Sequence, residues 1–177
     1  MATSHTMEYT LENASIPKEN LLGKEGQGFK ISLTALNLGR ITIASIANGL
    51  STAALNVSSR YAKEREQFGK PIGSFQGISF MLADMSTSLE AAKLLTLKAA
   101  DLEDSGESPI LSAAQAKLFA TDAAMKITTD AVQILGGAGY TKEFPVERYM
   151  REAKVLQIVE GTNQIQRAII GRTVTDL

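Results

Sequence analysis

The sequence predicts an all-α protein whose helices pack as an antiparallel four-helix bundle. Apolar residues recur at helical spacing over four long stretches, and no strand pattern of convincing length follows Pro17. The connections between these stretches are short and contain glycine or proline, which end helices. Short connections place consecutive helices side by side in opposite directions, so a bundle is the expected architecture.

One helical domain preceded by a short tail is expected. Apolar residues make up 44% of the 177 residues, enough to bury a core. Residues 1–25 form the tail, in which Tyr9 to Pro17 is predicted to be extended, and residues 26–177 form the bundle domain. The helices of this domain are predicted at Phe29 to about Gln67, about Phe75 to Ser105, Ile110 to Leu135, Phe144 to about Glu152, and Thr162 to the end.

The composition excludes several classes of function. The net charge is −1, so no basic surface points to nucleic acid as a partner. The chain has no cysteine and a single histidine, His5, which excludes thiolate chemistry and leaves no metal site to be expected. No apolar run is long enough to span a bilayer, and no secretory signal is present. A soluble intracellular protein without membrane insertion is therefore expected.

Glu160 is the leading candidate for a catalytic residue. It follows the apolar run Val155 to Val159 and precedes Gly161, where the backbone can turn sharply or let a ligand approach closely. Thr162 and Asn163 can cap the helix that follows. Burial at such a helix mouth would make the carboxylate a stronger base. The alternative is an acidic residue that is merely favoured by the helix macrodipole.

Two further segments combine residues that suit an anionic, aromatic ligand. Arg65-Glu66-Gln67-Phe68-Gly69, with Phe75-Gln76 just beyond, places a guanidinium and aromatic rings at a helix end, where they can bind a phosphate and a ring system together. Gln133-Ile134-Leu135-Gly136-Gly137 contains adjacent glycines whose backbone amides can close on an anion. For each segment, a plain helix end is the alternative interpretation.

Arg40 interrupts the apolar pattern of the first helix. A charge at such a position needs an ion-pair partner, water or an anionic ligand. The sequence leaves two interpretations open for it: a member of a structural ion pair, or an anchor for an anionic ligand.

The order of these motifs resembles the C-terminal part of an acyl-CoA dehydrogenase. The motifs are Arg65-x-x-Phe-Gly, Gln133-Ile-Leu-Gly-Gly-x-Gly-Tyr, Tyr149-Met-Arg-Glu-Ala-Lys and Glu160-Gly-Thr-x-Gln-Ile-Gln-Arg. Leu36-Asn-Leu-Gly-Arg-Ile matches as well, and the resemblance covers the chain from about Glu12 onward. It is nearest to the short-chain and short-branched-chain members. Asn37 departs from the medium-chain members, which carry an aspartate at this position.

The resemblance implies a reaction and a cofactor. Members of the family bind FAD and oxidise an acyl-CoA to the trans-2-enoyl-CoA. A glutamate, here Glu160, removes the α-proton while the β-hydrogen leaves as hydride to the flavin. Electron-transferring flavoprotein then accepts the electrons. Either a bacterial cytoplasm or a mitochondrial matrix is compatible with this reading.

The resemblance also implies roles for individual residues. Contacts with FAD are implied for Arg65, Glu66, Gln67, Phe68, Phe75, Gln76, Thr162, Asn163 and Gln164. Contacts with the FAD of a neighbouring subunit are implied for Gln133, Ile134, Leu135, Gly136 and Gly137. Contacts with the acyl-CoA substrate are implied for Asn37, Leu38, Gly39, Arg40 and Gly161, with Arg40 as the polar anchor.

The chain is shorter than the family pattern. Family members carry an N-terminal helical domain and a middle β-domain before this bundle, and the piece before Pro17 looks like the last strand of the middle domain. We therefore expect a C-terminal part of an enzyme that is inactive by itself and that forms a homotetramer or homodimer. The alternatives are a non-catalytic helical oligomerisation module and a relative that performs another flavin reaction, such as oxidation by molecular oxygen.

Overall fold

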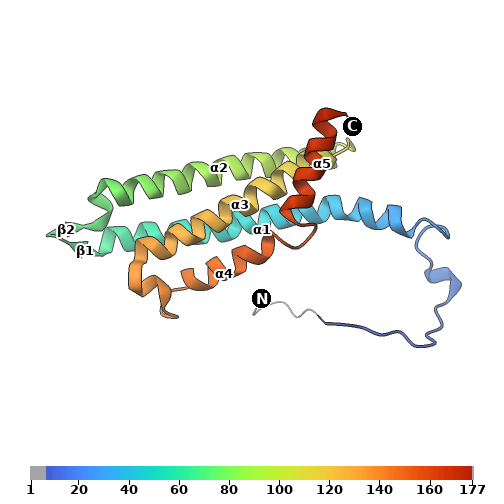
Figure 1. The fold of residues 1–177 in the computed structure, drawn as a ribbon, viewed down its shortest axis with the longest axis horizontal. Helices are drawn as coiled ribbons and strands as arrows, with labels where there is room; N and C mark the ends of the chain where they lie inside the picture. Colours follow the sequence, from blue (N-terminus) through green and yellow to red (C-terminus); the bar gives the residue numbers. More distant parts are fainter. Residues whose placement is uncertain (1–6, 177) are drawn as a thin grey trace.

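The computed structural model describes residues 7–176, so His5 lies outside the described residues. In this range the chain forms five α-helices: α1 (Gly28–Glu64), α2 (Gln76–Asp104), α3 (Ile110–Leu135), α4 (Val146–Leu156) and α5 (Asn163–Thr175). The three long helices α1, α2 and α3 lie side by side in alternating directions (Figure 1). The predicted all-α class is confirmed, and each predicted helix is present.

The first helix ends earlier than predicted, because a small hairpin follows it. Residues 66–67 (β1, Glu66–Gln67) pair in antiparallel register with residues 70–71 (β2, Lys70–Pro71). Phe68 and Gly69 connect the two strands, with φ angles of 53° and 78°. Two successive positive φ angles are typical of the tight turn that matches the twist of a hairpin. A 3₁₀ turn, η2 (Ile72–Ser74), then leads into α2.

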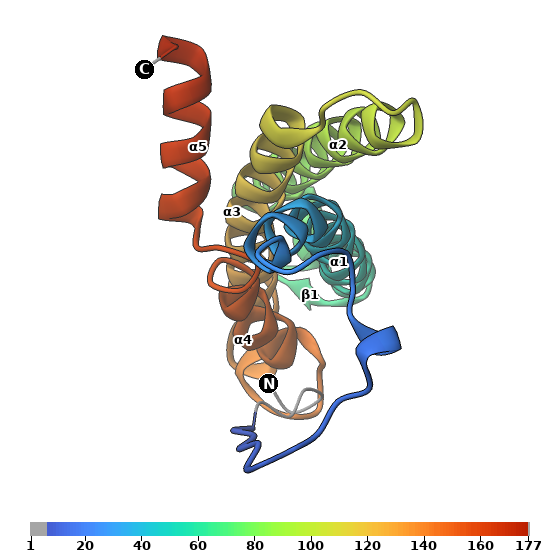
Figure 2. The same ribbon diagram turned by 90° about the vertical axis from the view of Figure 1, so that its right-hand side faces the viewer.

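The last helix lies outside the bundle, which differs from the expected arrangement. The short helix α4 takes the fourth position and packs against α3 and α1, whereas α5 contacts α3 and rises steeply across the long helices (Figures 1 and 2). The loop between α4 and α5 turns sharply because Glu160 and Gly161 both have positive φ angles, 54° and 86°. The chain therefore leaves the direction of α4 at the residue that the sequence singles out.

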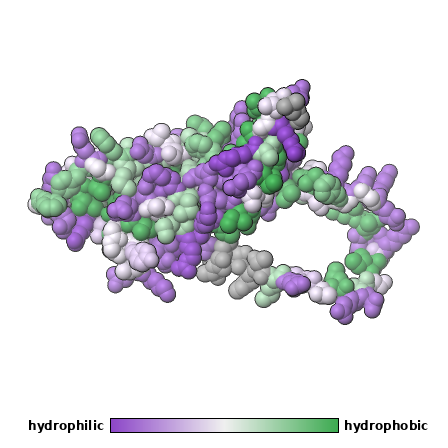
Figure 3. Space-filling model, in the orientation of Figure 1, coloured by the Kyte–Doolittle hydropathy of each residue, from purple (hydrophilic) through white to green (hydrophobic). Residues whose placement is uncertain are grey.

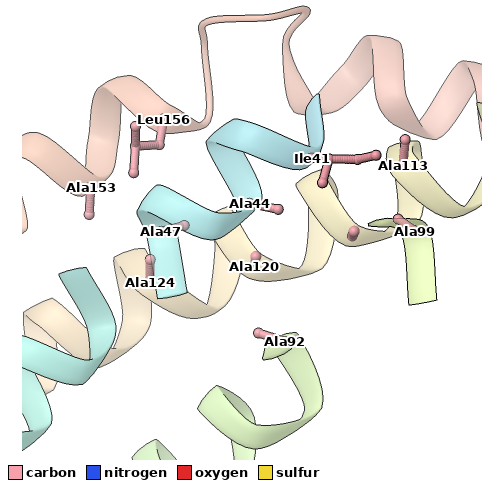
Figure 4. Close-up of a cluster of buried hydrophobic side chains, with 11 residues drawn as sticks. Ile41, Ala44, Ala47, Ala92, Ala99, Ala113, Ala120, Ala124, Ala153 and Leu156 are labelled. Carbon is pink, nitrogen blue, oxygen red and sulfur yellow. The ribbon is translucent and has the colours of Figure 1, made fainter. Parts of the chain in front are cut away.

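The core consists of two clusters along the bundle. One cluster is built largely from alanine and lies where α1, α2, α3 and α4 meet (Figure 4). Side chains this small let the helix axes approach closely. Its buried members are Ile41, Ala44, Ala47, Ala92, Ala99, Ala113, Ala116, Ala120, Ala124, Ala153 and Leu156. The other cluster contains larger residues such as Met85, Leu89 and Ile127, and extends to the end of the bundle that carries the hairpin.

The N-terminal segment has no buried residue. Residues 7–30 are all exposed, and the only regular element before α1 is the 3₁₀ turn η1 (Lys18–Asn20), so the extended piece expected before Pro17 is not paired as a strand. Hydrophobic surface lies along this segment and the first turns of α1 (Figure 3). None of the helices in residues 7–176 combines the length and apolar character needed to cross a membrane.

Candidate active site

Glu160 stands on the corner between α4 and α5 and faces α1. It is half-buried and adopts a left-handed backbone conformation that is uncommon for residues other than glycine. Its carboxylate approaches the backbone of α1 at Gly39. A Cβ atom added to Gly39 would collide with the Glu160 Oε2 atom, so the carboxylate would have to shift. The absence of a side chain at position 39 therefore makes the space that the carboxylate occupies.

Arg40 brings a positive charge to the same place. It is only 6% exposed, and its Nη1 atom donates a hydrogen bond to Asn37 Oδ1 at 2.8 Å. Burial lowers the pKa of the Arg40 guanidinium, and the negative charge of Glu160 opposes this shift. The Arg40 Nε atom is buried and has no hydrogen-bond partner among the described residues. Because an unpaired buried donor is costly, this geometry favours the anchor interpretation over a structural ion pair.

A buried lysine donates hydrogen bonds to two residues that follow Glu160, Gly161 and Asn163. Lys117 of α3 is 0% exposed, and its Nζ atom donates to the Gly161 carbonyl oxygen at 2.9 Å and to Asn163 Oδ1 at 2.7 Å. The side chain of the buried Gln166 of α5 donates to the same Gly161 carbonyl oxygen at 2.9 Å. It also donates, more weakly, to the backbone carbonyl oxygen of Glu160 at 3.3 Å. The Gly161–Thr162 peptide, one residue after Glu160, is thus held by donors from two helices.

Asp122 of α3 accepts hydrogen bonds from three side chains at and near the start of α5. Its Oδ1 atom accepts hydrogen bonds from Gln157 Nε2 and Asn163 Nδ2, each at 2.7 Å, and its Oδ2 atom pairs with Arg167 Nη2 at 2.8 Å. Thr162 caps α5 through a long bond of 3.4 Å from the Ile165 amide, as the sequence predicts. These contacts fix the first turn of α5 against α3.

Sequence reasoning missed Lys117, Asp122 and Gln166. A signal for Lys117 was available, because it is spaced at helical intervals from Ala113, Ala120 and Ala124, all of which belong to the buried face of α3. A lysine on such a face is almost never fully buried unless it is paired. Asp122 and Gln166 carry no comparable signal, because their roles depend on where α5 lies.

The second group of predicted residues lies at the hairpin end of the bundle. The side chains of Arg65, Glu66, Gln67, Phe68 and Gln76 are exposed, and Phe75 is half-buried. The rings of Phe68 and Phe75 meet edge to face at 6.1 Å, and the Lys70 ammonium lies 4.4 Å from the centre of the Phe75 ring. Phe68, at the tip of the hairpin, is 92% exposed. A cationic and aromatic surface therefore faces outward here.

The end of α3 lies at the same end of the bundle. Gln133, Gly136 and Gly137 are exposed, and Gly136 has a φ angle of 61°. Ile134 and Leu135, for which cofactor contacts are implied, bury their side chains in the core cluster instead. These two side chains hold the end of α3 in the bundle, so they are not the exposed part of this motif.

The two groups of residues are far apart. Arg40 and Arg65 stand near opposite ends of one helix, and 25 residues of α-helix span about 37 Å. The structure brings Asn37, Gly39, Arg40, Glu160, Gly161 and Asn163 together, while Gln164 of α5 and Leu38 of α1 are exposed beside them. It brings the Arg65 and Gln133 segments together at the other end, away from Glu160 (Figure 1).

Comparison with known proteins places this arrangement in a family. Residues 26–175 match the model of the acyl-CoA dehydrogenase C-terminal domain. The chain is 56% identical over 169 residues to an acyl-CoA dehydrogenase of Bacillus subtilis, covering 96% of this chain and 45% of that protein. The chain belongs to the acyl-CoA dehydrogenase family. It spans less than half the length of the curated relatives it matches.

Solved structures of similar chains have the same fold. Butyryl-CoA dehydrogenase of Megasphaera elsdenii superposes with a TM-score of 0.89 at 50% identity, over 90% of this chain and 42% of that chain. A chain in a structure described as the electron transferring flavoprotein of Acidaminococcus fermentans superposes with a TM-score of 0.91 at 53% identity, over 92% of this chain and 43% of that chain. Proteins described as short-chain specific acyl-CoA dehydrogenases occur among both bacterial and mitochondrial relatives.

Proposed function

We propose that this chain supplies the catalytic base and part of the cofactor site of an FAD-dependent acyl-CoA dehydrogenase. The reaction is oxidation of a short or short-branched acyl-CoA to the trans-2-enoyl-CoA. The observation that carries the proposal is the Glu160 corner, where a carboxylate stands in space left free by Gly39 and beside the buried Arg40. The relatives named for short-chain substrates support the substrate class.

Glu160 would act as the base that removes the α-proton of the thioester. This proton is weakly acidic, so its removal needs a positioned carboxylate shielded from water. Asn37, Leu38, Gly39, Arg40 and Gly161 would line the substrate, with Arg40 offering a hydrogen-bond donor and a positive charge to an anionic ligand. The carboxylate and Arg40 belong to different elements of this one chain, so the pair is assembled by folding of the bundle.

The residues at the hairpin end fit FAD as a ligand. Arg65 offers an exposed guanidinium for a phosphate, and Phe68 and Phe75 offer ring faces and edges for a flat ring system. Glu66, Gln67, Gln76 and Gln133 add hydrogen-bonding groups, and Gly136 and Gly137 add exposed backbone. Bound FAD would supply the hydride acceptor, a role that no protein side chain fills.

We propose that the chain contacts two different FAD molecules in an assembled homodimer or homotetramer. Thr162, Asn163 and Gln164 adjoin the base, whereas Arg65 stands about 37 Å from Arg40 along α1, with the Gln133 segment of α3 at the same end of the bundle as Arg65. This separation is longer than one dinucleotide, so the two groups would serve different active sites. Exposed Phe80, Leu94 and Leu97 on α2 and Phe119 on α3 offer apolar surface for such an assembly.

The remaining partners follow from the reaction and the length of the chain. Electrons taken up by the flavin would pass to electron-transferring flavoprotein, and the similar chain found in the Acidaminococcus fermentans structure supports this partner. The exposed apolar residues of the N-terminal segment and the first turns of α1 would contact further domains, so the isolated chain would be inactive. The same exposed surface also suits the alternative, a helical oligomerisation module without catalysis.

Glu160→Gln in the longest natural chain that contains these residues tests the proposal. Butyryl-CoA is the substrate, and both bleaching of the flavin and loss of deuterium from the α-carbon are followed. We expect turnover to fall by about 10²–10⁴-fold, because a positioned general base contributes roughly this factor. The control is Glu103→Gln, which removes an exposed carboxylate from α2 and should leave turnover unchanged. An unchanged rate for Glu160→Gln would favour the oligomerisation module.

A second measurement separates dehydrogenase from oxidase chemistry. Electron-transferring flavoprotein reduction and peroxide formation are measured side by side with the unaltered protein. The proposal expects reduction of the flavoprotein to dominate. Peroxide as the main product would assign the chain to a relative that reacts with molecular oxygen.

A further inference from the structure

Lys117 is the one fully buried cation in the described residues that no carboxylate pairs with directly. It is the largest side chain that the fold buries completely, and the ion pairs found among residues 7–176 involve Lys126, Arg151 and Arg167 instead. Its two hydrogen-bond acceptors, the Gly161 carbonyl and the Asn163 side-chain oxygen, are both neutral. Neutral acceptors repay little of the cost of removing an ammonium group from water. Packing alone would be served better by an apolar side chain of the same size.

Both acceptors belong to the segment that carries Glu160. Gly161 is the next residue along the chain, and Asn163 is the first residue of α5. Glu160 itself has a φ angle of 54°, a left-handed conformation that is unfavourable for a residue with a side chain. Such a conformation persists only where the surroundings hold it. Lys117 and Gln166 provide that hold, because both donate to the Gly161 oxygen at 2.9 Å.

We propose that Lys117 is a positioning residue for Glu160: its buried ammonium group holds Gly161 and Asn163 and thereby directs the Glu160 carboxylate at the space beside Gly39. Lys117 does not touch the substrate in this proposal. It acts through the Gly161 carbonyl group and the Asn163 side chain, and its charge from α3 adds to that of Arg40 from α1. The catalytic consequence rests on the proposed function, whereas the hold on the corner does not.

The acceptors that Lys117 would leave behind both keep a second donor. Gln166 Nε2 still donates to the Gly161 oxygen at 2.9 Å. The single Thr121 hydroxyl hydrogen, which can bond the Lys117 carbonyl oxygen at 2.8 Å, can turn instead to Asn163 Oδ1, 3.2 Å away. Methionine has a similar length and no charge, so Lys117→Met would strand neither acceptor and would relieve the buried charge. We therefore expect this variant to fold, with loss of the hold confined to the corner.

Hydrogen exchange on the 177-residue chain tests the hold without any activity. In Lys117→Met, peptides that cover residues 157–166 should exchange about tenfold faster or more, while those from α1 and α2 keep their rates. The matched control is Lys126→Met, which removes a lysine from the same helix whose side chain is 70% exposed and pairs with Asp130. It should leave the corner unchanged. Uniformly faster exchange across the helices, or no change at the corner, would overturn the proposal.

Kinetics in the longest natural chain test the consequence for catalysis. Displacing a catalytic group by about 1 Å costs on the order of 10²-fold, so kcat should fall by roughly 10- to 100-fold in Lys117→Met while KM for butyryl-CoA stays within about threefold. Lys126→Met should match the unaltered protein. An unchanged kcat in Lys117→Met, with Glu160→Gln inactive, would overturn the role of Lys117 alone. An active Glu160→Gln would instead refute the function on which this arm depends.

If Lys117→Met fails to fold, the hydrogen bonds of Lys117 can be measured in the unaltered chain. Lysine-selective ¹⁵N nuclear magnetic resonance would then be recorded on the 177-residue chain. The hold requires a slowly exchanging Lys117 ammonium group with cross peaks to Gly161 and Asn163. A rapidly exchanging ammonium group without these cross peaks would overturn the proposal.

Discussion

The polar residues at the two ends of the bundle differ in whether they are bonded within the chain. At the Glu160 corner, Lys117, Asp122, Asn163 and Gln166 are joined in hydrogen bonds within the chain. At the hairpin end, residues such as Arg65 point outward, and none of the ion pairs in the described residues involves them. The fold therefore fixes the side chains at the corner, whereas the side chains at the hairpin end are exposed and free to contact a ligand or a second subunit.

Among variants that keep Glu160, the largest expected effect on activity comes from closing the space beside its carboxylate. In Gly39→Ala the new Cβ would collide with Glu160 Oε2, so the carboxylate must move. We expect kcat/KM for butyryl-CoA to fall by about 10²-fold or more. The control is Gly49→Ala, an exposed site on α1 where a Cβ would meet nothing within 4 Å. It should retain activity and gain about 0.5–1 kcal/mol of stability. Equal activity in both variants would contradict the prediction that a side chain at position 39 displaces the Glu160 carboxylate.

The buried charge predicts a pH dependence of stability. Burial lowers the pKa of Lys117 from 10.5 to about 8; Asp122 on α3 and Glu160 on the corner oppose this shift, and Arg40 on α1 adds to it. Asp122 also pairs with Arg167 of α5. Between pH 8 and pH 10.5 the unfolded chain binds a proton that the folded chain has released. The free energy of unfolding should therefore rise through this window, whereas below pH 8 the buried cation costs its full amount.

Urea unfolding at several pH values measures this dependence. The unaltered chain should gain up to about 3 kcal/mol relative to Lys117→Met between pH 7 and pH 11. A neutral amine keeps two hydrogens, enough for both hydrogen bonds of Lys117, to Gly161 and to Asn163. The corner should therefore keep its structure while Lys117 loses its charge. Parallel stability curves for the two proteins would mean that Lys117 is solvated in the folded state.

A smaller effect should separate stability from cofactor binding at the hairpin end. Phe68 has a positive φ angle and is exposed, and Asn-Gly is the preferred pair for this turn. Phe68→Asn should raise thermal stability by about 0.5–1 kcal/mol, because asparagine tolerates the conformation. Flavin affinity of the assembled protein, measured by fluorescence, should fall at the same time. A gain in stability with unchanged affinity would remove Phe68 from the cofactor surface.

The smallest effect is expected at the cap of α5. The Thr162 hydroxyl accepts a long bond of 3.4 Å from the Ile165 amide. Thr162→Ala should therefore cost only about 0.5 kcal/mol, at the low end for such caps. Hydrogen exchange within α5 measures it. A loss as large as that of Lys117→Met at the corner would mean that the cap, and not the lysine, holds this segment.

Much of the fold could be predicted from local patterns. Apolar spacing located the helices. Gly136 marked the end of α3, because glycine can adopt a positive φ angle, and Pro145 marked the start of α4, because its fixed φ angle suits the beginning of a helix. The short hairpin after Glu64 was not predicted, since two-residue strands leave no periodic signal. The position of α5 outside the bundle was missed as well, because it depends on the left-handed turn at Glu160 and Gly161.

The sequence by itself determined the helices, the family and the identity of the candidate base. These properties depend on spacing along the chain and on short motifs, which are local. Only the tertiary structure decided that Glu160 meets Gly39, that Lys117 binds the Gly161 carbonyl next to Glu160, and that Arg65 stands about 37 Å from Arg40. The physical reason is that a helix is a stiff rod. Which residues of two rods touch is set by how the rods pack, and packing is a property of the whole core.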